Sequence, residues 1–115
     1  MLPVELDAQQ QATALTLRLH VAADLLWFRG HFPSLPILPG VAQLDWVLYY
    51  GLTRLVPGKA FASIENIKFQ QPVLPDAELE LHINWQAEKS VLSFQYRLLS
   101  DDGMPVASSG KIRLC

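Results

Sequence analysis

The sequence contains a single cysteine, Cys115, which is also the last of its 115 residues. One cysteine cannot form a disulfide within the chain, so a disulfide-stabilised scaffold is excluded and a reducing compartment is favoured. An excess of positive charge is missing as well, because 9 Lys and Arg residues stand against 11 Asp and Glu residues, for a net charge of -2 at pH 7. We therefore expect no nucleic-acid partner.

Long uncharged runs are also absent. The longest stretch without Asp, Glu, Lys or Arg is residues 30–44, which contains three prolines and is shorter than the roughly 20 apolar residues that a membrane-spanning helix needs. The amino terminus has neither the cationic start nor the apolar segment of a signal peptide. These absences predict a soluble cytoplasmic protein without a membrane span.

The chain is rich in apolar residues. Of its 115 residues, 50% are hydrophobic and 17% are charged. This composition is enough to build a core, and it excludes general disorder. No internal repeat or low-complexity linker divides the chain. We therefore expect a single domain over residues 1–115.

Alternating hydrophobic and polar residues predict half-buried strands over much of the chain. The alternation is clearest in residues 12–21, 78–86 and 92–98, and it is weaker in residues 106–114. Residues 63–69 form a fifth candidate strand, in which the apolar residues fall out of phase. A bulge or bend is expected there.

Residues 41–56 are predicted to form the one helix. Pro39 lies near its start, where proline is tolerated, and Pro57 and Gly58 end it. The helix is apolar nearly all round, so it is expected to be buried in its own domain or in an interface. The order of strand, loop, helix and then a four-strand meander favours an α+β fold, in which an antiparallel sheet wraps around one long central apolar helix. This arrangement is the hot-dog fold.

Two residues that can exchange protons lie near the start of this helix. His31 lies in a proline-stiffened loop just before it, and its unperturbed pKa of about 6.5 suits a general base. Asp45 lies within the helix, four residues after Val41 and three before Leu48, on an apolar stripe. We expect this carboxylate to be desolvated and its pKa to be raised, as a general acid requires.

The amino terminus of the same helix supplies a third group. It offers free backbone N–H groups and the positive end of the helix dipole. Gly40 has no side chain, so a substrate oxygen can approach its N–H closely. A base, an acid and an oxyanion donor can therefore come from one short segment.

Other interpretations of these residues are open. A lone histidine in a loop is more often a hydrogen-bonded structural residue than a catalyst, and a lone aspartate in a helix is usually solvated. Ser34, three residues from His31, would allow a Ser–His–Asp hydrolase, but the glycine pattern of a nucleophile elbow is missing. No residue spacing matches a metal site, and no Gly-rich phosphate or dinucleotide loop is present. His20 and His82 fall on polar strand faces and are expected at the surface.

The segment that holds these residues resembles a known signature. Residues 28–41, FRGHFPSLPILPGV, followed by the acid Asp45, are similar to the signature of the hot-dog 3-hydroxyacyl-[acyl-carrier-protein] dehydratases, the FabA- and FabZ-type enzymes. The spacing of fourteen residues from His31 to the acid matches, and residues 67–75 are similar to the family's stretch after the helix. Residues 38–46 most resemble the small ApeI-like dehydratases of aryl-polyene pathways.

The resemblance implies dehydration of a 3-hydroxyacyl thioester to a trans-2-enoyl thioester. In the roles that it implies, His31 removes the α-proton, and Asp45 of the neighbouring subunit helps the 3-hydroxyl leave as water. The N–H of Gly40 holds the thioester carbonyl as negative charge develops. The backbone carbonyl of Ile37 orients the histidine.

The resemblance also implies partners. The substrate is carried on the phosphopantetheine arm of an acyl carrier protein in the bacterial cytoplasm, and no dissociable cofactor or metal is needed. The enzyme is a homodimer with shared active sites, a higher oligomer, or an assembly with a second hot-dog subunit. The fatty chain lies in a tunnel along the helix. Arg29, Arg54 and Lys59 are candidates for contacting the acidic carrier protein.

Three features depart from the family pattern. The acid is Asp45, as in FabA-type enzymes, whereas FabZ-type enzymes carry Glu at this position. Trp46 follows the acid where a small residue is usual, and the chain is shorter than most members.

Two alternatives stay open: a hot-dog thioesterase in which Asp45 activates water, and a non-catalytic subunit that stabilises another dehydratase.

Overall fold

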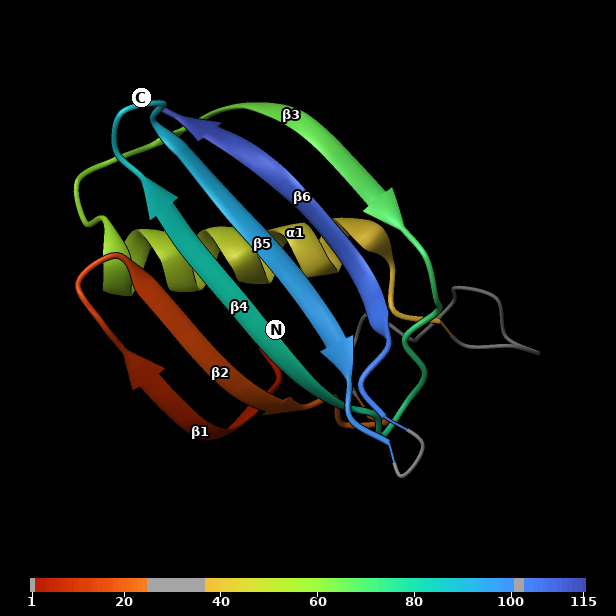
Figure 1. The fold of residues 1–115 in the computed structure, drawn as a ribbon. Helices are drawn as coiled ribbons and strands as arrows, with labels where there is room; N and C mark the ends of the chain where they lie inside the picture. Colours follow the sequence, from red (N-terminus) through yellow and green to blue (C-terminus); the bar gives the residue numbers. More distant parts are fainter. Residues whose placement is uncertain (1, 25–36, 101–102) are drawn as a thin grey trace.

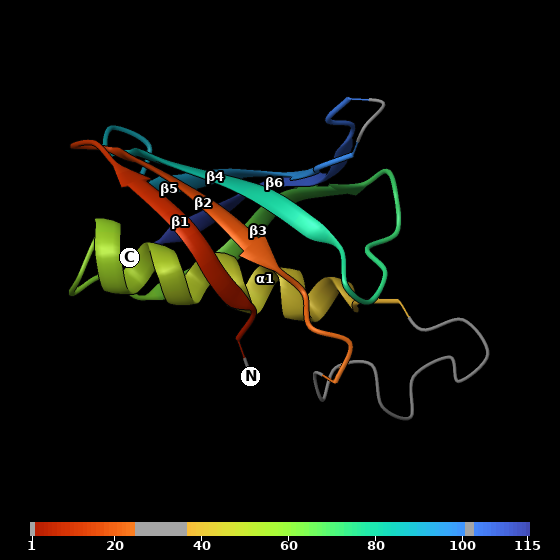
Figure 2. The ribbon, with the colours of Figure 1, turned by 90° about the horizontal axis from the view of Figure 1, so that it is seen from below.

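The computed structural model describes residues 2–24, 37–100 and 103–115. The predicted base His31 lies outside these described residues, as do Arg29 and Ser34. One curved sheet and one helix make up the described chain (Figure 1). The view turned by 90° places the helix against one face of the sheet, with no strand on the other side of the helix (Figure 2).

The strands pair into one sheet, and the helical segments form a second layer packed on it. In chain order they are β1 (Val4–Gln10), β2 (Ala14–His20), α1 (Gly40–Tyr50), a π-helical segment η2 (Gly51–Leu55), β3 (Phe61–Phe69), β4 (Glu78–Gln86), β5 (Val91–Leu98) and β6 (Val106–Leu114). The sheet order is β1-β2-β4-β5-β6-β3, and every neighbouring pair is antiparallel. The predicted α+β architecture, an antiparallel sheet packed on one helix, is confirmed.

The inner strands bury one face, as their alternation predicts. In β4, Leu79, Leu81 and Ile83 are at most 1% exposed, whereas Glu80 and His82 between them point away from the core. Each leucine or isoleucine buried in this way contributes about 1.5–3 kcal/mol relative to an exposed position. The sheet therefore has an apolar face toward α1 and a polar face toward solvent.

The strand order differs from the predicted meander. The antiparallel run of β4, β5 and β6 is confirmed, but β3 pairs with β6 at the edge of the sheet, and β4 pairs with β2. Residues 70–77 carry the chain from this edge to the middle of the sheet, a step too wide for a two-residue hairpin turn. Alternation predicts that a segment is a strand and not which strand it pairs with.

The sequence pattern does not predict β1. All seven of its residues are exposed, and its sequence VELDAQQ is rich in acidic and amide residues that are rare in strands. Its pairing with β2 makes it a strand. By contrast, the bulge expected in residues 63–69 is confirmed, because the β3–β6 register shifts twice.

The helix is shorter than the long central helix that the sequence predicts. α1 spans 11 residues and is followed by a π-helical turn, in which the N–H of Val56 donates to the carbonyl of Gly51 at 2.9 Å. A Cβ atom on Gly51 would lie 2.7 Å from Cδ1 of Leu92, so only glycine allows this close packing on β5. The Thr53 hydroxyl also donates to the Tyr49 carbonyl at 2.6 Å, and such back-bonding disturbs the regular helix.

Candidate active site

The first turn of α1 borders a hollow of about 400 Å³. Its walls include Ile37, Gly40 and Gln43, together with residues 69–72 that follow β3. Two of the predicted site residues, Gly40 and Ile37, therefore lie together. The placement of His31 relative to them lies outside the described residues.

Gly40 is the first residue of α1. Pro39 precedes it in an extended conformation, and its carbonyl accepts hydrogen bonds from the N–H groups of Ala42 and Gln43 at 3.1 and 3.3 Å. Within the described chain, the N–H groups of Gly40 and Val41 have no backbone acceptor. Such N–H groups and the helix dipole favour negative charge at this end of a helix.

The aromatic ring of Phe69 lies over Gly40. A Cβ atom added to Gly40 would lie 2.5 Å from Cζ of Phe69, closer than two carbon atoms can approach. Any side chain at this position would therefore force this ring, which lines the same hollow, to shift. Glycine keeps the first turn of α1 open to a ligand.

Asp45 lies in a different place. It borders a second hollow of about 260 Å³, whose other walls are apolar. These walls are made by Val41, Leu44, Leu48, Phe61, Ile64 and Ile112. The predicted apolar surroundings of Asp45 are thus confirmed, but one chain does not bring this carboxylate to the hollow at Gly40.

The expected desolvation of Asp45 is not found within a single chain, because its side chain is exposed there. The sheet covers the side of α1 that carries Trp46 and Val47, both 0% exposed. Val41 and Tyr49 lie one turn to either side of Asp45, at 64% and 46% exposure. The sequence predicts that this apolar helix is buried in its own core or in an interface. Burial in its own core is found only on the side that faces the sheet.

We call the apolar surface beside Asp45 the open face. It consists of the outer side of α1 and the edge strand β3, and its exposed members are Val41, Tyr49, Phe61, Ile64 and Phe69. Exposed apolar residues gathered in this way mark an interaction site. An unpaired strand edge beside them is a template for pairing with another chain.

The sequence pattern did not point to two residues of the hollow, Gln43 and Phe69. Gln43 is 3% exposed, its side-chain oxygen Oε1 accepts a hydrogen bond from Ser108 Oγ at 2.6 Å, and its backbone carbonyl accepts one from Tyr96 Oη at 2.6 Å. Burial raises the pKa of Tyr96 well above its usual value, with smaller contributions from Tyr50 and Asp45, so the phenol stays a donor. An amide in the first turn of an otherwise apolar helix is the sequence signal that could have identified Gln43.

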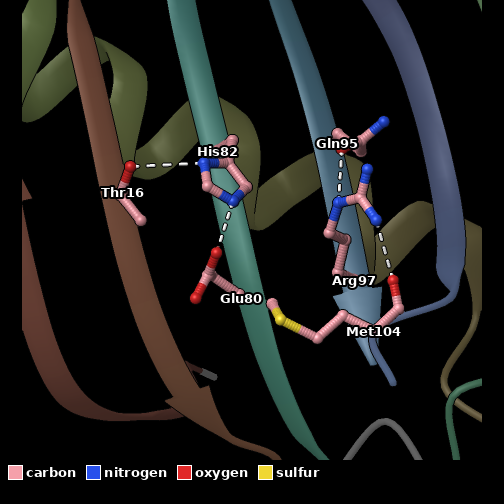
Figure 3. A network of polar contacts seen from close by, with 6 residues as sticks. All are labelled: Thr16, Glu80, His82, Gln95, Arg97 and Met104. Atoms are coloured by element: carbon pink, nitrogen blue, oxygen red, sulfur yellow. Dashed lines mark hydrogen bonds and ion pairs between the residues drawn. The ribbon is translucent and has the colours of Figure 1, made fainter. Parts of the chain in front are cut away.

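Polar side chains on the opposite face of the sheet form a separate surface network (Figure 3). His82 lies between Thr16 and Glu80, with Nδ1 at 3.3 Å from Oγ1 and Nε2 at 2.6 Å from Oε1. Nearby, Arg97 donates to Gln95 at 2.8 Å and to the carbonyl of Met104 at 2.8 Å. His82 is thus a surface histidine, as predicted, as is the partly exposed His20 beside Asp76.

Two of the cations predicted to contact a carrier protein have partners within the chain. Arg54 Nη1 donates to Glu5 Oε2 at 3.1 Å, its Nη2 contacts the other carboxylate oxygen, and the guanidinium lies 5.2 Å from the centre of the Tyr50 ring. Lys59 Nζ lies 5.9 Å from the centre of the Trp85 ring. Arg54 therefore ties η2 to β1, and the carrier contact stays a prediction.

Among the described residues, no three His, Cys, Asp or Glu side chains come together as a metal site would require. The described helix is also too short to cross a membrane.

A family model described as ApeI-like, ApeI dehydratase, matches residues 7–111. The chain belongs to this family. The predicted membership of the ApeI-like branch of the hot-dog dehydratases is thereby confirmed. The predicted activity agrees with the family's name.

Solved structures support the same placement of this ApeI-like chain. A chain of the dehydratase heterocomplex ApeI:P from Xenorhabdus doucetiae is 47% identical, covers 100% of this chain and 99% of its own, and has a TM-score of 0.93. An uncharacterised protein from Erwinia carotovora subsp. atroseptica is 52% identical, with coverage of 100% and 97% and a TM-score of 0.91. The dehydratase domain of the polyketide PpsC from Mycobacterium tuberculosis, at 16% identity and a TM-score of 0.74, shares the fold alone.

Curated relatives carry the name 3-hydroxyacyl-[acyl-carrier-protein] dehydratase FabZ. The relative from Gluconobacter oxydans is 33% identical over 76% of this chain, and the match spans 55% of its own length. The relative from Tolumonas auensis is 29% identical over 92% of this chain and 76% of its own. The ApeI-like chain thus spans about half of the first relative and three quarters of the second.

Replacing Gly40 by alanine tests the need for an open first turn. Alanine favours a helix over glycine by about 1 kcal/mol, so Gly40→Ala is expected to fold with a melting temperature close to that of the wild type. We expect the rate of dehydration to fall at least about tenfold, because the added methyl group narrows the approach to the N–H. Melting curves and kcat/KM measure the two effects separately.

The control is the double variant Gly40→Ala/Phe69→Ala, compared with Phe69→Ala alone. Removing the ring gives the new methyl group room. The double variant should stay about tenfold slower than Phe69→Ala. Equal rates for these two variants would show that the methyl group acts only by displacing the ring.

Proposed function

We propose that this chain catalyses the dehydration of a 3-hydroxyacyl-[acyl-carrier-protein] thioester to the trans-2-enoyl thioester. The observation that carries the proposal is the start of α1. Gly40 lines a hollow there, its N–H has no backbone acceptor among the described residues, and the chain belongs to a family of dehydratases. The names of the ApeI-like and FabZ relatives support the same reaction and a place in polyene or fatty-acid synthesis.

The proposed roles follow from the chemistry of the substrate. A proton α to a thioester carbonyl is acidic only if the charge that moves onto the oxygen is stabilised. The N–H of Gly40, at the positive end of the helix dipole, serves this purpose. Neutral His31 accepts the α-proton, and the carbonyl of Ile37 accepts the other ring N–H and fixes the tautomer.

The second proton transfer completes the reaction. The carboxyl of Asp45 gives its proton to the 3-hydroxyl, the C–O bond breaks, and water leaves as the double bond forms. The proton that His31 removed then returns to the carboxylate through solvent. Nothing is oxidised or reduced, so the proposed reaction needs no cofactor beyond the phosphopantetheine arm of the carrier protein.

We also propose that a second copy of the chain covers the open face and supplies Asp45 to the hollow at Gly40. Asp45 and Gly40 border different hollows in one chain, so a single chain does not complete the site. The open face is apolar and ends at an unpaired strand, which suits continuous pairing across two copies. The relative from Xenorhabdus doucetiae belongs to a dehydratase heterocomplex, so a second hot-dog chain is the competing occupant.

The substrate and compartment complete the proposal. The acyl carrier protein presents the thioester, and the acyl chain lies along α1 between the two copies, where the side chains around Asp45 are apolar. Such a substrate, together with a single unpaired cysteine, fits the bacterial cytoplasm.

The reaction is tested by incubating the full chain with a 3-hydroxyacyl-carrier-protein thioester and weighing the intact acyl species by mass spectrometry. We expect loss of one water with the wild type and at least a hundredfold slower loss with His31→Ala and with Asp45→Asn. Release of the free acid would contradict the proposal and indicate a thioesterase instead. No change in mass with any chain length would favour a non-catalytic subunit.

The proposed dimer is tested with a charge on the open face. Val41→Lys places an ammonium group on an apolar surface that the second copy would bury, so we expect a monomer in sedimentation experiments where the wild type is a dimer. The matched control is Val4→Lys, where the valine is 49% exposed and lies on β1, at the opposite edge of the sheet from β3. A dimer that survives Val41→Lys as well as Val4→Lys would contradict this interface.

A further inference from the structure

Gln43 belongs both to the core and to the hollow at Gly40. Only 3% of its surface is exposed, yet the residue forms part of the wall of the hollow. Gln43 and Gly40 are three residues apart in α1, a spacing that places two residues on one side of a helix. Gln43 and Gly40 are therefore neighbours in the wall of the hollow.

The sheet determines which end of the Gln43 amide faces the hollow. Ser108 Oγ donates to Oε1 at 2.6 Å, and Ser108 is 0% exposed. Tyr96, also 0% exposed, donates to the backbone carbonyl of Gln43 at 2.6 Å. Because Oε1 is turned toward β6, the amide nitrogen Nε2 is the end that remains.

Nε2 has two N–H donors and no hydrogen bond to any described residue. The described residues contain no buried side-chain nitrogen or oxygen without a partner. Nε2 is therefore not both buried and without a partner, and the open space that Gln43 borders is the hollow at Gly40. A donor beside this hollow that has no partner among the described residues is available to a ligand oxygen.

We infer that Nε2 of Gln43 binds the carbonyl oxygen of the substrate thioester, as a second donor beside the N–H of Gly40. This inference rests on the proposed function and adds a residue to it. Two donors fixed before the reaction stabilise the charge that develops on this oxygen more than one donor does. Ser108 is then a positioning residue, which holds the Gln43 amide without touching the substrate.

Three variants separate substrate binding from a role in the core. Gln43→Glu keeps the shape of the side chain and an acceptor for Ser108, but it has no donor at the hollow. Gln43→Met keeps the length without either polar group. Ser108→Ala keeps the Gln43 donor and removes only the hydrogen bond that orients it. All three are compared with the wild type in the full chain by melting temperature, kcat and KM.

We expect Gln43→Glu and Gln43→Met to lower kcat about 10- to 100-fold with a smaller change in KM, because the donor acts mainly on the developing charge. Ser108→Ala should destabilise the fold about as much as Gln43→Met, but it should lose less than about fivefold in kcat. A rate loss that follows the melting temperature in all three variants would overturn the inference. Failure of both Gln43 variants to fold would also overturn it, by assigning the residue to the core alone.

The dehydration activity of the wild type distinguishes failure of this inference from failure of the proposed function. If the wild type does not dehydrate the thioester, the proposed function fails. If the wild type is active and both folded Gln43 variants keep at least half of its kcat, only the role of Gln43 fails.

Discussion

One-sided burial of α1 is the constraint on which the site depends. The sheet covers the side of the helix that carries Trp46 and Val47, and it leaves Val41, Asp45 and Tyr49 outside. A helix with apolar residues on both sides and a sheet on only one is incomplete as a single chain. The same geometry that anchors the helix thus leaves Asp45, the proposed acid, on an exposed surface with apolar neighbours.

The sheet also determines where the proposed oxyanion donors lie. Hydrogen bonds from Tyr96 on β5 and Ser108 on β6 both end on Gln43 in the first turn of α1. They fix the start of the helix relative to two central strands, which are among the most buried parts of the molecule. The N–H of Gly40 is therefore held in place by the core, whereas the role proposed for Asp45 depends on a second chain.

Much of this fold follows from the sequence, because burial of one sheet face imposes alternation on β4 and β5. The exposed strand β1 carries no such pattern, and the place of β3 beside β6 depends on contacts between distant segments. For the site, the sequence identifies Gly40 as the start of the helix and Asp45 among apolar neighbours. It does not reveal the exposure of Asp45, because periodicity cannot distinguish a core from an interface.

The most direct test of the shared site is complementation between two inactive variants, His31→Ala and Asp45→Asn, after their subunits exchange. If each site takes His31 from one copy and Asp45 from the other, a hybrid dimer contains one intact site and one site with both changes. Random exchange then restores roughly a quarter of the wild-type activity, since half of the dimers are hybrids with one working site each. Native mass spectrometry verifies the exchange. No recovery of activity in a mixture that contains hybrids would contradict a site shared between two chains.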